Sequence, residues 1–426
     1  MFLIEFVWGT KMFKSFHNRA KFAVVVVLLF VLSLSVSMVG AQETVFDIDA
    51  IIANAGGECQ TPSGDPLIIG YLPDFSEVGA FADVPGSQAA EFMAELINCA
   101  GGVDGTPVQV IIQPGDALDL ELTLRAAQDL VDAGVHVVLG PPFSDVGLPL
   151  LNVLGGQIPA LHVASTEIVL ADPSIYSFIP SFIDEVQGNA AGEWAYDNGF
   201  RRAVTLSSTD NPYFNVTTAA FAEAFVAMGG EHAGDYSFSV GDDDYSSQVN
   251  EILSLDPAPD VIYTANIMPF VEIFAGQLRA AGLTEIQLVG PDAFDATRII
   301  DGGETTDGAV YTTHAFPTEG SRLEAFLTAF EAVKGEPLTP AFGALGADAV
   351  ALVAQAYLAS GKQLDPIAIG DAITAMESFN LVTIDSATYQ TADGVVGYSI
   401  RNVIIAQNVD GVPTFLEERS PADYSE

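Results

Sequence analysis

Short apolar runs and amphipathic stretches alternate along most of the chain after residue 65. The first block contains apolar runs of strand length at 67–71, 108–112, 137–139 and 160–163, and stretches of helical period at 86–99 and 118–133. A second block repeats the rhythm, with strands expected at 203–206, 236–239, 261–264 and 287–289 and helices at 217–228, 247–255 and 269–281. Regular βα alternation predicts an α/β protein whose parallel sheets are covered by helices on both faces.

Two such blocks, separated near Ile179-Pro180-Ser181, predict two sheets and therefore two lobes. A smaller third block holds the remaining expected elements: a strand at 309–313, helices at 323–333, 347–359 and 367–375, and strands near 398–406. We expect this block to add to both lobes, so that the chain crosses between them more than once. The expected division is a leader segment at 42–64, lobe 1 at 65–179 plus 314–385, and lobe 2 at 180–313 plus 386–426.

The first 41 residues have the pattern of an export signal. Four basic residues, Lys11, Lys14, Arg19 and Lys21, precede an uncharged apolar run, and small residues follow at Val39-Gly40-Ala41. We expect residues 1–41 to be a signal peptide, which places the protein in the periplasm or at the cell surface. The apolar run is also long enough to span a bilayer, so a retained membrane anchor is the alternative.

Charge and cysteine usage limit the partners. The formal net charge is −42; without residues 1–41 the chain has 10 basic and 55 acidic residues, a net charge of −45. Such an acidic surface disfavours binding to nucleic acid and to anionic lipid. Two explanations of the charge remain: an adaptation for solubility, or a cleft that attracts cations. Cys59 and Cys99 suggest a disulfide in an exported protein, with two buried free thiols as the alternative. No ligand spacing suggests a metal site.

Catalysis and cofactor binding are not expected. The sequence lacks a glycine-rich dinucleotide fingerprint, a P-loop, a G-x-S-x-G elbow and an H-E-x-x-H helix. The histidines lie on separate segments, and His162, in an expected core strand, is predicted to pack rather than react.

Six segments, in order, resemble motifs of the type I periplasmic binding proteins, the leucine/isoleucine/valine-binding family of ABC importers. The turn at 98–105, Asn-Cys-Ala-Gly-Gly-Val-Asp-Gly, resembles the family's N-x-x-G-G-V-x-G turn, in which glycines end a helix and reverse the chain. The other similar segments are 137–144, 158–166, 257–263, 277–283 and 289–292. The resemblance implies two doubly wound lobes joined by a three-stranded hinge, with the ligand between them at the carboxyl ends of the strands.

The resemblance also implies a binding site. Ser144 and Thr166 match the positions that hold the ligand carboxylate, with Ala164 supplying backbone groups, although both hydroxyls could merely cap helices. Asp292 matches the acid that takes the ligand ammonium. Tyr213 and Phe81 match aromatic positions. The implied function is capture of a small amino acid, amide or amine and its delivery to the membrane permease of an ABC importer.

Several departures leave the ligand open. Phe143 and Ala117 lie where the family has a cysteine pair, and polar or bulky residues stand near 266–268. Acids crowd the expected strand ends: Asp74, Asp116, Asp145, Glu167, Asp210, Asp292 and Asp295. If several of them line the cleft, a cationic ligand becomes plausible. We expect a monomer; a ligand-sensing ectodomain with the same fold is the alternative function.

Overall fold

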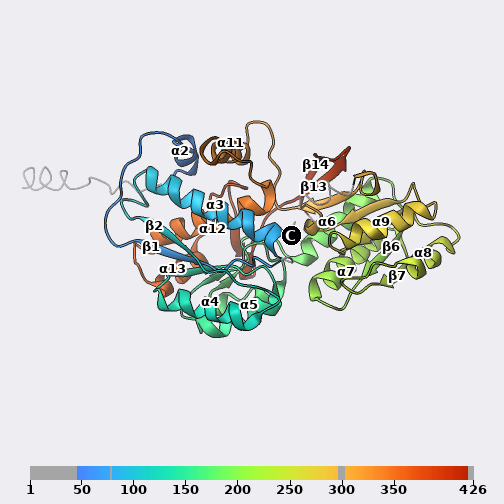
Figure 1. Ribbon diagram of the computed structural model, residues 1–426, viewed down its shortest axis with the longest axis horizontal. Coiled ribbons are helices and arrows are strands. Elements are labelled where there is room, and N and C mark those ends of the chain that lie inside the picture. Colours follow the sequence, from blue (N-terminus) through green and yellow to red (C-terminus); the bar gives the residue numbers. More distant parts are fainter. Residues whose placement is uncertain (1–45, 77–78, 296–302, 421–426) are drawn as a thin grey trace, which may run out of the picture. The chain divides into compact units, whose positions relative to one another are not determined.

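The computed structural model describes residues 46–76, 79–295 and 303–420, and the statements below concern these residues. The expected signal peptide or anchor, residues 1–41, lies outside them. The chain from Phe46 onward forms one compact unit. It contains two mainly parallel sheets, each flanked by helices, and this confirms the expected α/β class with two lobes (Figure 1).

The first sheet is entirely parallel, with strand order β2-β1-β3-β4-β5. Its strands are β1 Leu67–Tyr71, β2 Val108–Ile112, β3 Val137–Leu139, β4 Ala160–Leu161 and β5 Ser177–Phe178. The central strands β1 and β3 are almost wholly buried. Strands buried on both faces explain the continuous apolar runs in the sequence.

Helices cover both faces of this sheet (Figure 1). They are α2 Ile48–Ala53, α3 Ala80–Cys99, α4 Leu120–Asp132, α5 Ser144–Leu154, α11 Arg322–Lys334, α12 Pro340–Ala359 and α13 Pro366–Ala375. Helices α3 and α12 pack closely because glycines meet at their crossing: a Cβ on Gly346 would lie 1.9 Å from the carbonyl oxygen of Gly86. Among the described residues, α12 alone is long and apolar enough to span a membrane, and here it is buried in the core.

The second sheet has strand order β14-β13-β10-β9-β8-β6-β7. Its strands are β6 Arg202–Ser207, β7 Glu231–Ser237, β8 Val261–Thr264, β9 Gln287–Gly290, β10 Val310–Thr313, β13 Val403–Val409 and β14 Val412–Arg419. The last two strands pair antiparallel at one edge and the others are parallel. Its helices are α6 Asp184–Asp197, α7 Pro212–Ala227, α8 Ser246–Leu253 and α9 Phe270–Ala280.

The remaining elements are short. They are the 3₁₀ helices η1 Ile168–Leu170, η2 Pro173–Ile175, η3 Asp292–Phe294 and η4 Gly303–Thr305, and the hairpin β11 Thr388–Thr391 with β12 Gly394–Ile400. Tyr389 of this hairpin packs on Phe178 of the first sheet, with ring centroids 5.5 Å apart. The hairpin therefore packs against the first sheet. The exact lobe bounds remain a prediction.

Three segments of the chain join the two sheets, and they are hydrogen-bonded to one another. The amide of Ile179 donates to the carbonyl of Gly397 at 2.7 Å, and the amide of Ser399 donates to the carbonyl of Ser181 at 3.0 Å. The hydroxyl of Ser181 lies 2.6 Å from Nδ1 of His314, on the segment that follows β10. The hinge implied by the resemblance is therefore three hydrogen-bonded crossings.

The N-terminal part of the described chain is attached covalently to the first lobe. Cys59 and Cys99 form a disulfide, and the alternative of two free thiols is wrong. The expected leader at 42–64 includes the helix α2, which packs against α11 and α3. Ile48 and Ile52 of α2 are buried in the same core as β1, so this segment is part of the folded unit.

Candidate functional site

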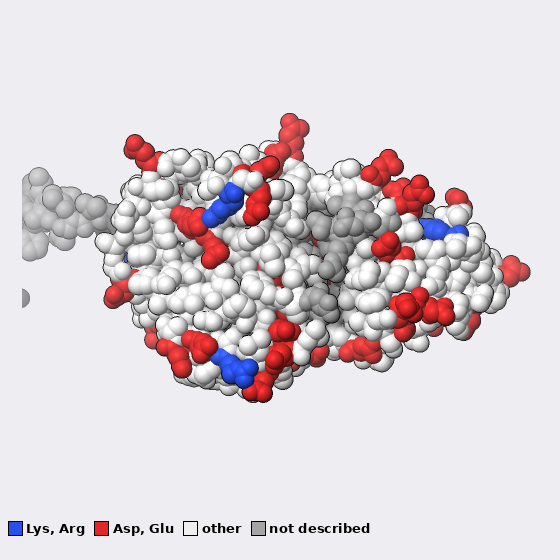
Figure 2. All heavy atoms as spheres, in the orientation of Figure 1, with Lys and Arg blue, Asp and Glu red and all other residues white. Residues whose placement is uncertain are grey.

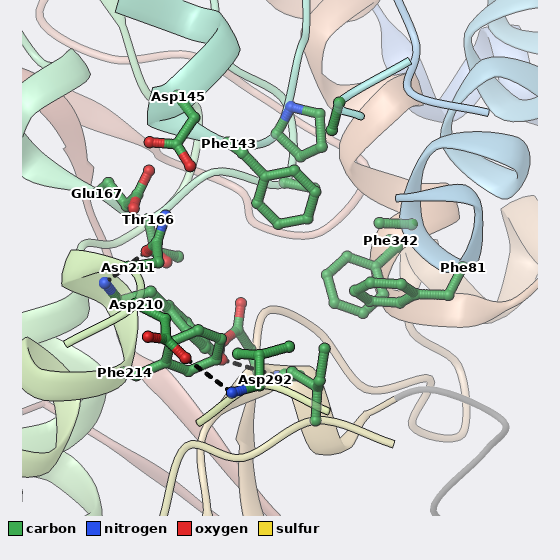
Figure 3. Close-up of a pocket in the computed structure, with 18 of the residues that line it drawn as sticks. Phe81, Phe143, Asp145, Thr166, Glu167, Asp210, Asn211, Phe214, Asp292 and Phe342 are labelled. Atoms are coloured by element: carbon green, nitrogen blue, oxygen red, sulfur yellow. Dashed lines mark hydrogen bonds between the residues drawn. The ribbon is translucent and has the colours of Figure 1, made fainter. Parts of the chain in front are cut away.

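A cavity of about 300 Å³ lies where the loops that follow strands of both sheets meet (Figure 3). Open α/β sheets place ligands at the carboxyl ends of their strands because loops and helix starts converge there. The residues that line the cavity are Phe81, Ala82, Ala117, Leu118, Pro142, Phe143, Asp145, Ala164, Thr166, Glu167, Asp210, Asn211, Tyr213, Phe214, Val240, Ile267, Asp292, Ala293 and Phe342. Most are apolar or aromatic, with a few acids among them, as is usual for a small-molecule site.

The wall contributed by the first sheet follows β3 and β4. Ala164 and Thr166 lie in the loop after β4, and Ala164 has a left-handed φ of 64°, which is uncommon for a residue with a Cβ. The carbonyl of Thr166 accepts the amide of Asp184 at 2.9 Å and thereby connects this loop to the start of α6. This hydrogen bond joins the wall of the first sheet to a helix that covers the second sheet.

Glu167 occupies the helix start at which the resemblance places a ligand carboxylate. Its Oε2 accepts the backbone amide of Ser144, the first residue of α5, at 2.5 Å. The residue before the helix, Phe143, has no side-chain group that caps it. Because helix N-termini favour negative charge, the carboxylate of Glu167 stabilises α5 from another part of the chain.

The environment of Glu167 is unfavourable for its charge. Burial raises the pKa of Glu167 above its ordinary value and the nearby carboxylate of Asp145 raises it further, against the hydrogen bonds from Ser144 and the approach of Asn211, which lower it. The residue is only 4% exposed, and its Oε1 makes no hydrogen bond of standard geometry with the described residues. A buried carboxylate oxygen without a partner is costly unless a ligand supplies one.

The opposite wall contains Asp292, which begins η3 after β9. Its Oδ1 accepts the hydroxyl of Tyr213 at 2.7 Å, and its Oδ2 lies 2.8 Å from Nε2 of His314. Its backbone amide donates to the side-chain oxygen of Gln187 on α6 at 2.9 Å. Burial favours the neutral acid, but the bond to His314, the charge of His314 and the bonds from Tyr213 and Gln187 outweigh it, and the pKa of Asp292 lies below its ordinary value.

His314 connects this wall to the hinge. Its Nδ1 is bonded to the hydroxyl of Ser181 on the first crossing, while its ring stacks on Phe182 with centroids 4.4 Å apart. The chain Asp292–His314–Ser181 therefore joins a cavity residue to two of the three crossings between the sheets.

The structure places five of the six sequence-predicted site residues around one cavity: Phe81, Ala164, Thr166, Tyr213 and Asp292. Ser144 is not among the residues that line the cavity, and its amide is bonded to Glu167, which does line it. A role for these residues in ligand binding remains a prediction. Phe143 and Ala117, noted in the sequence as departures from the family's cysteines, both line the cavity.

Other lining residues carried weak or no sequence signals. Asp145, Glu167 and Asp210 follow strands, so their place near the site could be inferred, although their directions could not. Phe342 comes from α12, far along the chain, and its ring meets Phe81 edge-on with centroids 5.2 Å apart. His162 is buried outside the cavity with Nε2 3.0 Å from the hydroxyl of Ser177, and burial lowers its pKa to about 4. It packs in the core, as predicted.

The comparisons with known proteins agree with this geometry. The family described as periplasmic binding protein matches residues 66–410. A Leu/Ile/Val-binding protein of Rhizobium johnstonii, BraC3, is 25% identical over 350 residues, which are 78% of this chain and 93% of that protein. Among solved structures, a leucine-binding protein of Thermotoga maritima has a TM-score of 0.71 at 24% identity, covering 84% of this chain and 99% of its own.

A second solved structure shows a different ligand on the same fold. It is an ABC-transporter solute-binding protein of R. palustris in complex with benzoate, with a TM-score of 0.68 at 21% identity over 84% of this chain and 97% of its own. The match over residues 66–410, together with two sheets that enclose a cavity at their strand ends, identifies the chain as a member of the periplasmic binding protein family.

Proposed function

We propose that this protein is the extracytoplasmic solute-binding component of an ABC importer. It captures a small amine-bearing solute in the cavity between the two sheets and delivers it to a membrane permease. The observation that carries the proposal is the composition of the cavity wall: both sheets contribute strand-end loops, so a bound solute contacts both lobes at once. The names of the relatives, a Leu/Ile/Val-binding protein and ABC-transporter solute-binding proteins, support the same role.

Binding at a junction of two lobes couples capture to movement. A solute that contacts both walls stabilises the arrangement in which the walls face each other, and the three crossings are the segments about which they can rotate. The hydrogen-bonded chain from Asp292 through His314 to Ser181 connects the cavity to these crossings. We infer that the closed, ligand-bound form is the one that a permease recognises. The protein works as a monomer outside the cytoplasmic membrane and needs no cofactor.

Thermal unfolding tests the capture of solutes. The purified protein is screened against amino acids, amides, amines and sugars, and a bound solute at about 100 times its Kd stabilises the folded state by about 2.7 kcal/mol. The expected result is a rise in Tm with at least one class that bears an amine. If no class raises Tm, capture of a small solute is wrong. A rise only with sugars keeps the capture but contradicts an amine-bearing ligand.

A further inference from the structure

The first sheet's anion site is filled by the chain itself. In the resemblance, the start of α5 receives the carboxylate of an amino-acid ligand, but here its amide at Ser144 is bonded to Glu167 at 2.5 Å. Glu167 is 4% exposed, so its carboxylate is an internal occupant rather than a surface group that swings away. A ligand carboxylate in this position would displace a buried side chain and would also meet its negative charge.

The lining of the cavity has the charge of a cation site. Four of its residues are acids, and none of those that line it is Lys or Arg. Each wall supplies one buried acid, Glu167 or Asp292, and one exposed acid, Asp145 or Asp210. Figure 3 shows Asp145 beside Glu167 on one side of the cavity, with Asp210 and Asp292 below them. On the face of the molecule in Figure 2, the charged side chains are mostly acidic and are scattered over the surface, and they attract cations from solution.

Aromatic rings complete the site. Phe81 and Phe342 lie across the cavity from Asp145 and Glu167, Phe143 lies beside Asp145, and Phe214 lies next to Asp210 (Figure 3). The faces of aromatic rings attract ammonium groups, most strongly where water is excluded, and cages of aromatic rings are a known mode of alkylammonium recognition. A site that combines aromatic rings with carboxylates suits an organic cation, because the carboxylates attract its charge and the rings contact its hydrocarbon part. Among the described residues no group of three or more acids, histidines or cysteines is arranged to hold a metal ion, so the acids do not form a metal site.

We propose that the cavity binds a small organic cation that has no carboxylate, such as an alkylamine or a quaternary ammonium compound. Its ammonium group lies between Glu167 and Asp292, and its hydrocarbon part contacts the phenylalanine rings. The positive charge of this group offsets the buried negative charge of Glu167, and an alkylamine, unlike a quaternary ammonium, can in addition donate N–H hydrogen bonds. The proposal rests on the proposed function and defines its ligand class: Glu167 acts as the residue that rejects amino acids and selects amines.

Matched pairs of ligands test this selection by isothermal titration calorimetry on the purified full chain. Leucine is compared with isoamylamine, which is leucine without its carboxylate, and glycine betaine is compared with choline. The expected result is that the member without a carboxylate binds at least tenfold tighter in one or both pairs. If neither pair shows this preference although at least one of the four compounds binds, the inference is overturned while the proposed function stands. If neither series binds, nor any other amine, both fail.

Variants at Glu167 separate its charge from its bulk. Glu167→Ala frees the amide of Ser144 and is expected to weaken isoamylamine or choline at least tenfold and to strengthen leucine or betaine by a similar factor. Glu167→Gln keeps the shape and is expected to weaken the cation without creating amino-acid binding. Glu223→Gln, an exposed acid on α7, is the control and changes neither affinity. Tm confirms that each variant is folded, and if Glu167→Ala is not folded, unchanged cation affinity in Glu167→Gln overturns the assignment.

Discussion

Each wall of the cavity buries one carboxylate, but the two carboxylates differ in their hydrogen bonds and in the direction of their pKa shifts. Asp292 is fully engaged: Tyr213 and His314 bind its two oxygens, and its pKa is lowered. Glu167 has only one engaged oxygen, in a setting where burial raises its pKa. The difference teaches that a buried carboxylate can have both oxygens hydrogen-bonded on one wall and only one of them on the other, with opposite effects on its pKa.

The largest expected effect concerns Asp292. Asp292→Asn removes a buried carboxylate that accepts the hydroxyl of Tyr213 and is bonded to His314. Hydrogen bonds to a charged group contribute about 1.5–3 kcal/mol each, so the free energy of unfolding should fall by about 3 kcal/mol. Urea denaturation measures it. The matched control is Asp295→Asn in the same loop, where burial raises the pKa of the acid to about 7 and the charge is already partly lost. Equal losses in the two variants would contradict a special role for the Asp292–His314 pair.

The pH dependence of stability should differ in sign between the walls. The raised pKa of Glu167 means that the folded state holds its proton more tightly than the unfolded state, so its contribution to stability is present at low pH and falls as the pH rises through 4.5 and above. The lowered pKa of Asp292 stabilises the fold above 3.8, and that stabilisation is lost as the pH falls below this value.

Urea midpoints measured from about pH 3 to pH 8 test these signs. Glu167→Gln should become more stable relative to the wild-type protein as the pH rises, whereas the deficit of Asp292→Asn should shrink as the pH falls below 3.8. A Glu167→Gln protein that loses relative stability with rising pH would show that Glu167 is a well-satisfied anion like Asp292.

The smallest expected effect is on ligand affinity when one phenylalanine ring of the cavity is removed. Phe143→Leu removes an aromatic face from the first wall while keeping an apolar side chain, and it should weaken choline about fivefold. The neutral isostere 3,3-dimethylbutanol is the control ligand, and its affinity should change little because it has no positive charge. Equal losses for both compounds would assign Phe143 a packing role rather than a cation–π role.

The sequence predicted the architecture because the alternation of apolar and amphipathic segments is itself a physical requirement of buried parallel sheets. It did not predict helix α6, which contains two glycines, Gly188 and Gly192. The structure explains them: a Cβ on Gly188 or Gly192 would lie 2.4 Å from a carbonyl oxygen of α7, so close packing requires glycine there. Tertiary contact decides such positions, and a local reading of propensity cannot include it.

The site was predictable in part for the same reason. Residues that directly follow strands, such as Thr166 and Asp292, reach the cavity because strand ends converge. Packing between distant segments decides where the side chain of Glu167 points and brings Phe342 of α12 to the cavity. No local sequence pattern encodes such packing. The sequence therefore predicted the position of the cavity, whereas the position of the Glu167 side chain, on which the proposed ligand class rests, is seen only in the structure.

A crystal structure of the protein with its tightest-binding amine tests the central claim most directly. The account predicts that the ammonium nitrogen lies within about 6 Å of the carboxylates of both Glu167 and Asp292, with the hydrocarbon part against Phe143 and Phe342 and the bond from Ser144 to Glu167 intact. An amine bound elsewhere, or a ligand carboxylate seated on the amide of Ser144 with Glu167 displaced, would contradict it.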